Sequence, residues 1–296
     1  MKKVRPIIST IICSLLLIVV TYSLGYKVNS QEESNKFRSF HSSLIEGSEN
    51  RIIKVAVLDS GIDSKHSYFQ NLVIEEHNMI NPNQSRSDLL GHGTAIAGII
   101  VNVGHMKNSE NNIEFHSVKV LDDKGKGTYA DVIKGLEWCI QNDIDLINLS
   151  LGFKKNNPLL QDKIKEVIDE NILVIASAGN NYGFDIEYPA AYDGVISVSA
   201  INEHNKIAEF SAKGIIDFYT NGTNIPILLP NDKHDVKDGS SLATAHITGI
   251  VTLIFQKSSD LDFGKPLYSQ IMDTLQNVAD HNSENQNIIR FSELVY

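Results

Sequence analysis

Three side chains that can together drive acyl transfer occur in separate glycine-containing segments of the chain. Asp59 lies in LDSGID, His92 in GHGTAIAG and Ser241 in GSSLATAHITG. Serine is a poor nucleophile until an imidazole accepts its proton and a carboxylate holds that imidazole in the correct tautomer. Taken singly, each residue has an equally good structural explanation. Asp59 fits a turn residue at a strand end, His92 fits a helix cap, and Ser241 fits the N-cap of its apolar helix. The chemistry therefore depends on a fold that brings all three together.

The rest of the chain alternates between short apolar runs and longer helical patterns. Runs typical of buried parallel strands occur at residues 52–60, 115–121, 145–152, 172–180 and 194–201. Helical patterns occur at residues 91–103, 129–143, 159–170 and 240–257. This alternation predicts an α/β fold of three layers, in which a mainly parallel central sheet has helices on both faces. Ligands of such sheets lie beyond the carboxyl ends of the strands, where the pattern places Asp59, residues 150–152 and Asn180.

The three glycine-containing segments resemble the active-site signatures of the subtilisin-like serine proteases (subtilases, peptidase family S8), in that family's order of Asp, His and Ser. Three further segments match in the family's order: VKVLDDKGKGTYADVIKGLEWCI, DLINLSLG and SAGNN. The resemblance runs from about Arg51 to Gln256 and implies a serine endopeptidase. By this resemblance, Asp59 orients and supports His92, His92 acts as general base and then as general acid, and Ser241 attacks the scissile carbonyl.

The resemblance also implies roles for residues around the triad. Asn180 in SAGNN matches the asparagine of the oxyanion hole. Ser241 rather than Ser240 matches the nucleophile, because it stands two residues after Gly239. The family binds peptide substrate as an added strand between two backbone segments, which correspond to residues 126–129 and 150–152. The substrate-binding residues implied there are Gly127, Tyr129, Ser150, Leu151 and Gly152.

Substrate preference is predicted from the segment IEYPAAYDG. Glu187 stands just before YPA, at the position that forms the base of the family's primary specificity pocket. A carboxylate in such a pocket favours a cationic side chain, so cleavage after Arg or Lys is predicted. The preceding loop NYGFDI differs in length from typical members, which leaves a solvated loop glutamate as the alternative. For Tyr129, an exposed tyrosine at a helix start is likewise an alternative.

Composition narrows the classes of partner. A formal net charge of -10 excludes the clustered basic surface that nucleic-acid binding needs. Cys13 and Cys139 build no disulfide framework, and the ten histidines show no paired-ligand spacing, so no metal cofactor is expected. A structural calcium ion is not supported either, because VNVGHMKNSENNIEF lacks the family's Asn-rich calcium loop. We expect a monomer that acts on a peptide or protein substrate.

The N-terminus carries an export pattern. Lys2, Lys3 and Arg5 precede an uncharged, largely apolar run at residues 6–26, which fits either a cleaved signal peptide or a retained membrane anchor. Residues 27–50 are polar and are interpreted as a linker or short pro-region, so the peptidase domain is expected at residues 51–296. The protein is therefore predicted to be extracytoplasmic, in contact with a membrane only through its N-terminal segment.

The biological role is less closely defined by the sequence. A short domain, the lack of a long pro-domain and a preference for basic residues resemble the subtilisin-like peptidases that remove leader peptides from lantibiotic-type precursors. A general secreted protease is an alternative within the same class. An alternative from another class is a membrane-anchored pseudoenzyme or peptide-binding module that uses the same groove. Retention of Asp59, His92, Asn180 and Ser241 favours the enzyme.

Overall fold

The computed structural model describes residues 40, 52–70, 72–104, 113–257, 261–282 and 284–290. Their central sheet has nine strands in the order β10-β11-β7-β6-β5-β4-β1-β3-β2, and only β10 pairs in antiparallel fashion. The strands are β1 (Ile53–Asp59), β2 (Ile74–Asn78), β3 (Ile113–Lys119), β4 (Leu146–Leu149), β5 (Leu173–Ser177), β6 (Val195–Ile201), β7 (Phe218–Asn221), β10 (Asp280–His281) and β11 (Asn287–Ile288). The predicted α/β fold with a mainly parallel sheet is confirmed.

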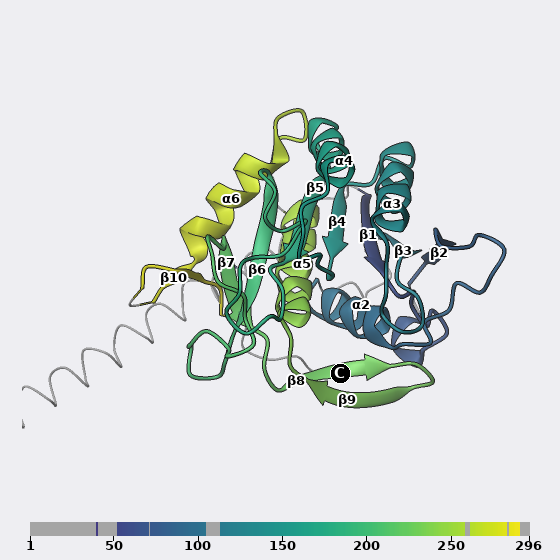
Figure 1. Ribbon diagram of the computed structural model, residues 1–296, viewed down its shortest axis with the longest axis horizontal. Coiled ribbons are helices and arrows are strands. Elements are labelled where there is room, and N and C mark those ends of the chain that lie inside the picture. Colours follow the sequence, from purple (N-terminus) through teal and green to yellow (C-terminus); the bar gives the residue numbers. More distant parts are fainter. Residues whose placement is uncertain are drawn as a thin grey trace, which may run out of the picture.

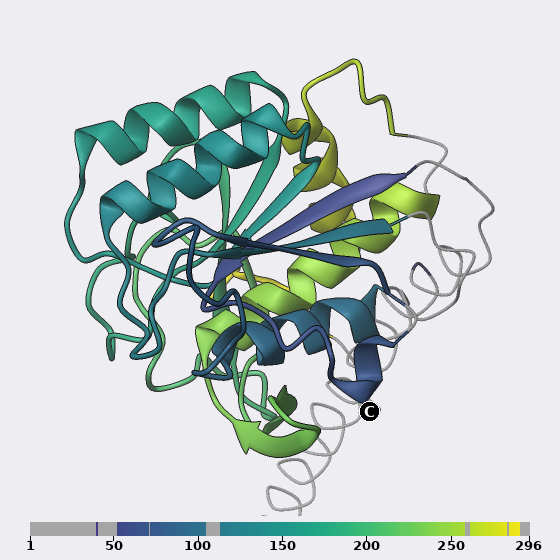
Figure 2. The same ribbon diagram turned by 90° about the vertical axis from the view of Figure 1, so that its right-hand side faces the viewer.

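Helices cover both faces of this sheet (Figures 1 and 2). Figure 2 shows α3 (Tyr129–Gln141) and α4 (Pro158–Asp169) on one side of the strands, with α2 (His92–Val103) and α5 (Ser240–Lys257) on the other. The core is split accordingly, because alternate residues of a strand point to opposite faces. In β1, Val55 and Val57 pack on the side of α2 and α5, whereas Ala56 and Leu58 pack on the side of α3 and α4. The last helix, α6 (Leu267–Val278), packs on the same side of the sheet as α2 and α5.

The helices begin where the sequence supplies capping groups. Thr128 accepts a hydrogen bond from the backbone N–H of Asp131 at the start of α3, and Asn157 does the same for Leu160 at the start of α4, where Pro158 is the first helical residue. Helix α5 is buried and packs against both the sheet and α2. Its threonines satisfy their hydroxyls within the helix, as Thr244 does by donating to the carbonyl of Ser240.

Several elements are absent from the sequence-based prediction. They are the short helix η1 (Ser67–Phe69), strands β2, β7, β10 and β11, the hairpin of β8 (Ile225–Leu229) and β9 (Lys233–Lys237), and α6. Strand β2 reads IEEHN and β9 reads KHDVK, so neither contains the apolar run by which a buried strand is recognised. Both lie at a sheet edge, where pairing with one neighbour is enough to hold a polar strand.

The expected signal or anchor segment (1–26) lies outside the described residues, as does the expected linker (27–50) apart from Phe40. In the part of the chain that the structure describes, no helix has the length and apolar character needed to cross a membrane. The strand ends that matter for chemistry lie within it: β1 ends at Asp59, β4 leads into Ser150, and β5 leads to Asn180.

Candidate active site

Asp59 and His92 form a close acid–imidazole pair. Asp59 ends β1 and is 1% exposed, while His92 begins α2 and keeps part of its ring accessible. His92 Nδ1 lies 2.7 Å from Asp59 Oδ1 and 2.9 Å from Oδ2. An ionised carboxylate only accepts hydrogen bonds, so Nδ1 carries the proton and a neutral ring presents its lone pair at Nε2. Nε2 is thus the atom available to accept a proton from a nucleophile.

The environment of His92 also sets its basicity. Burial lowers the pKa of His92, but the charge of Asp59, the hydrogen bond that His92 donates to Asp59 and the charge of Asp88 together outweigh it and raise the pKa above the ordinary imidazole value. A raised pKa strengthens the ring as a proton acceptor in the transition state. It also means that the neutral, active form is lost at a higher pH than for an ordinary histidine.

Asp88, which no motif in the sequence marks, joins the loop after β1 to the start of α2. Its Oδ1 accepts from Ser60 Oγ at 2.9 Å and from the N–H groups of Leu90 and Gly91 at 3.1 and 2.8 Å. Its Oδ2 accepts from the N–H and the hydroxyl of Thr94 at 2.9 and 2.7 Å. Asp88 is 2% exposed. A buried carboxylate with five donors holds the backbone on both sides of His92 in one arrangement.

Close backbone packing supports the same junction. A Cβ on Gly93 would collide with the carbonyl oxygen of Gly61, and Gly61 itself has a φ of 104°. Both positions therefore require glycine. Beneath them the buried Lys119 donates from Nζ to the carbonyl of Ser60 at 2.6 Å and pairs with Asp123 at 3.0 Å. The GHGT sequence is thus explained by the approach of α2 to the end of β1.

Ser241 and Ser240 occupy different environments at the start of α5. Ser240 is 0% exposed, and its hydroxyl lies 2.6 Å from that of Ser177. Ser241 is partly exposed, and its Oγ donates to the carbonyl of Ser150 at 3.1 Å. Before it attacks a substrate, the Ser241 hydroxyl must leave this carbonyl and donate its hydrogen bond to a base instead. Of the two serines, only Ser241 has a hydroxyl that is both accessible and held by a weak neutral acceptor.

Asn180 lies beside the same helix start. Its side-chain oxygen accepts from the N–H of Ser240 at 2.9 Å. This contact orients the amide and leaves Nδ2 as a donor. Nδ2 lies near Gly239, since a Cβ built there would be 3.5 Å from it. The N–H of Ser241 has no partner inside the helix at this position, so two donors face the start of α5, which is the arrangement that an oxyanion requires.

A cleft of about 460 Å³ runs along the face that contains His92. Its lining includes four of the predicted substrate-binding residues, namely Gly127, Ser150, Leu151 and Gly152. Leu90, Leu121, Gly125, Lys126 and Phe153 complete the wall. Tyr129 is not part of the lining, but its ring stacks on Phe153 at 4.1 Å and its hydroxyl donates to the carbonyl of Lys155. Tyr129 therefore supports the cleft wall from behind.

Glu187 is not part of this lining, but its side chain lies between Gly179 and Gly152, and Gly152 does line the cleft. A Cβ on Gly152 would collide with Glu187 Oε2, and a Cβ on Gly179 would come within 2.8 Å of Glu187 Cδ. The backbone N–H of Glu187 donates to Ala178 at 2.9 Å, and Asn181 Nδ2 approaches Oε1 at 3.4 Å. Among the described residues no Lys or Arg pairs with this half-buried carboxylate.

Comparison with known proteins gives a consistent result. Residues 50–288 match the model of the Subtilase family, Peptidase_S8. The minor extracellular protease Epr of Bacillus subtilis is 34% identical over 71% of this chain, and the match covers 33% of Epr. Subtilisin DY of Bacillus licheniformis is 29% identical over 79% of this chain and 88% of its own length. The major intracellular serine protease of Bacillus subtilis is 32% identical over 81% of this chain and 79% of its own length.

Proposed function

The chain belongs to the subtilase family of serine endopeptidases, and from this premise we propose that it is an extracytoplasmic peptidase that cleaves a precursor peptide after a basic residue. Glu187, whose carboxylate lies against Gly152 of the cleft wall, carries the specificity part of the proposal. The apolar run at residues 6–26 behind Lys2, Lys3 and Arg5 supports export.

In the proposed mechanism His92 Nε2 takes the proton of Ser241 as Oγ attacks the substrate carbonyl. Asp59 accepts from Nδ1 and stabilises the imidazolium that forms. The negative oxygen of the tetrahedral intermediate accepts from Asn180 Nδ2 and from the N–H of Ser241. The ring then returns its proton to the leaving amine, and a water molecule repeats the sequence to release the acyl group.

The cleft is suited to hold the substrate as an extended strand. Residues 150–152 and 126–127 line it from two sides, so a peptide between them can pair with backbone on both edges. Backbone pairing does not depend on the side chains of the substrate, which leaves selection to the pocket at Gly152. There the substrate side chain would meet the carboxylate of Glu187.

Cleavage-site profiling tests the preference. We expect peptides with Arg at the residue before the scissile bond to be hydrolysed faster than matched Leu peptides. Glu187→Gln should reduce kcat/KM for the Arg peptide by roughly 10- to 100-fold, the value of one charge-assisted hydrogen bond, and leave the Leu peptide unchanged. The matched control is Asp185→Asn, which removes an exposed carboxylate of the same loop. Equal rates on Arg and Leu, or an unchanged Arg preference in Glu187→Gln, would refute the proposal.

Labelling with a fluorophosphonate tests the chemistry independently of specificity. The expected result is one adduct on Ser241 in the folded chain. Absence of an adduct, with peptide binding intact, would instead support the peptide-binding module. Mass spectrometry of the mature N-terminus distinguishes a cleaved signal from a retained anchor.

A further inference from the structure

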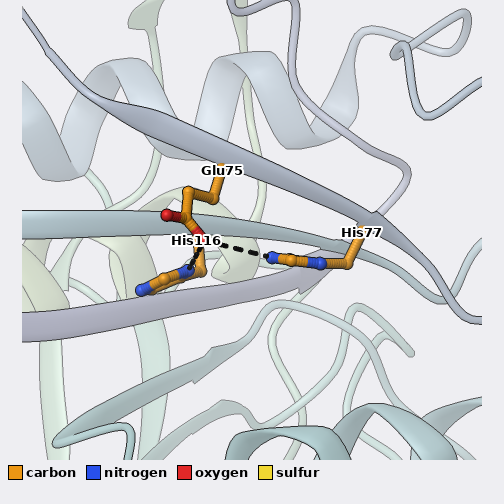
Figure 3. Close-up of side chains that lie close together, drawn as sticks. All are labelled: Glu75, His77 and His116. Carbon is orange, nitrogen blue, oxygen red and sulfur yellow. Dashed lines mark ion pairs between the residues drawn. The ribbon is translucent and has the colours of Figure 1, made fainter. Parts of the chain in front are cut away.

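A second group of chemically competent side chains lies away from the cleft, at the edge of the central sheet. Glu75 and His77 are on β2, and His116 is on the adjacent strand β3. Glu75 is the register partner of His116 in the parallel pairing. Residues two apart on a strand, and the residue paired with one of them, project from the same face. Figure 3 shows the three side chains converging there.

The distances bring three donor atoms around one point. Glu75 Oε2 lies 3.8 Å from His77 Nε2 and 3.6 Å from His116 Nδ1. All three donor atoms lie within 4.8 Å of one another. The ring of Trp138 from α3 covers the histidines, with ring centroids 4.1 Å from His77 and 5.3 Å from His116. Glu75 is exposed, so a solute can reach the group from solvent.

The imidazole nitrogens in this group lack hydrogen-bond partners. His116 has a side chain that is only 5% exposed, yet neither of its ring nitrogens has a partner among the described residues. His77 Nε2 is in the same situation. Buried polar atoms are rarely left unpaired, and those that are often face an ion or an ordered water.

We propose that Glu75, His77 and His116 bind one Zn²⁺ ion at this sheet edge. Two imidazole nitrogens and one carboxylate oxygen are a ligand set that Zn²⁺ accepts, whereas Ca²⁺ and Mg²⁺ prefer oxygen alone. Ligands at about 2.0 Å from a tetrahedral ion are roughly 3.3 Å apart. The carboxylate–imidazole distances of 3.6 and 3.8 Å need shifts of only tenths of an ångström to reach that value. Water fills the fourth position.

Two neighbouring features fit a bound ion. Glu114 Oε2 lies 3.9 Å from His116 Nε2, the ring nitrogen that faces away from Glu75. At 3.9 Å this contact is not a hydrogen bond, but a carboxylate that reached the far nitrogen of a ligating histidine would fix its tautomer and strengthen it as a ligand. The ion also links β2, the outermost strand, to β3 through side chains, and so stabilises an edge held by backbone pairing on one side only.

The test uses the full chain without a histidine tag, in a Ser241→Ala background that prevents self-digestion. After chelator treatment and dialysis, calorimetry should show one Zn²⁺ per chain bound at the cluster, and the midpoint of thermal unfolding should rise with Zn²⁺ but not with Mg²⁺. His77→Gln and His116→Gln should each weaken binding tenfold or more. His204→Gln is the matched control, because His204 and Glu203 form an exposed pair at 3.6 Å.

Peptidase activity is not the readout, because Zn²⁺ bound to His92 would inhibit turnover without involving the cluster. His116→Gln removes a buried ring and can disturb folding. His77→Gln is included because the His77 side chain is 25% exposed, so a loss of binding in that variant is not explained by a folding defect. Wild-type affinity in both variants would overturn the proposal. So would binding that is lost only in His234→Gln, since that places the ion beside His66 and Asp232.

Discussion

Substitution of Asp88 by asparagine tests whether this carboxylate positions His92. The change keeps the size of the side chain but replaces an acceptor oxygen by an NH₂ group. The backbone N–H of Thr94, a residue that is 0% exposed, then faces a donor instead of Oδ2. A buried donor without a partner costs about 1–3 kcal/mol, and the remaining bonds to Asp88 lose their charge assistance. We therefore expect Asp88→Asn to lower the free energy of unfolding by about 2–4 kcal/mol.

The same substitution should change the pH dependence of catalysis. His92 must be neutral to accept a proton, so kcat/KM rises as pH increases through its pKa. The negative charge of Asp88 is one of the causes that raise this pKa. Its removal lowers the pKa of His92 and moves the acid limb of the profile to lower pH. A role confined to stability would leave the acid limb where it is.

Urea unfolding in the Ser241→Ala background measures the first effect, and the pH profile of kcat/KM in the active background measures the second. The control is Asp169→Asn, which removes an exposed carboxylate of α4 paired with Lys165. It should cost under about 1 kcal/mol and leave the profile unchanged. The reasoning is refuted if Asp88→Asn stays within about 0.5 kcal/mol of its parent and the acid limb does not move.

Two further predictions concern the start of α5. Ser241→Ala should lower kcat by about 10⁶-fold, the loss measured for subtilisin itself. Ser240→Ala should keep most of the activity but lower the free energy of unfolding by about 1–3 kcal/mol, because the Ser177 hydroxyl loses its buried partner. Kinetics and urea unfolding of both variants separate the two roles, and the opposite pattern would make Ser240 the nucleophile. Asn180→Asp keeps the oxygen that accepts from the N–H of Ser240 but removes the Nδ2 donor. We therefore expect kcat to fall by about 10²–10³-fold, as for the removal of an oxyanion donor in this family, while the free energy of unfolding changes little. Undiminished kcat would exclude Asn180 from the oxyanion site.

Much of the fold and of the cleft was predictable because the relevant signals are local. Strands β1, β4, β5 and β6 are compact apolar runs, and a buried parallel strand needs apolar residues on both faces. The glycines beside His92 mark close backbone approach, which the contact of Gly93 with Gly61 explains. Strands β2 and β9 were missed because they are polar edge strands, for which pairing with a neighbour replaces an apolar pattern.

By itself, the sequence determined which reactive side chains the chain contains, because Asp59, His92, Asn180 and Ser241 stand in short segments in which residue type and spacing are informative. Only the tertiary structure decided how distant residues combine. Asp88 has no distinctive local context, and its role arises because five donors from two sides of a loop meet its carboxylate. His77 and His116 show no ligand spacing along the chain, and they meet because β2 and β3 pair in one register. Pairing register is a property of the assembled sheet, so no local pattern reports it.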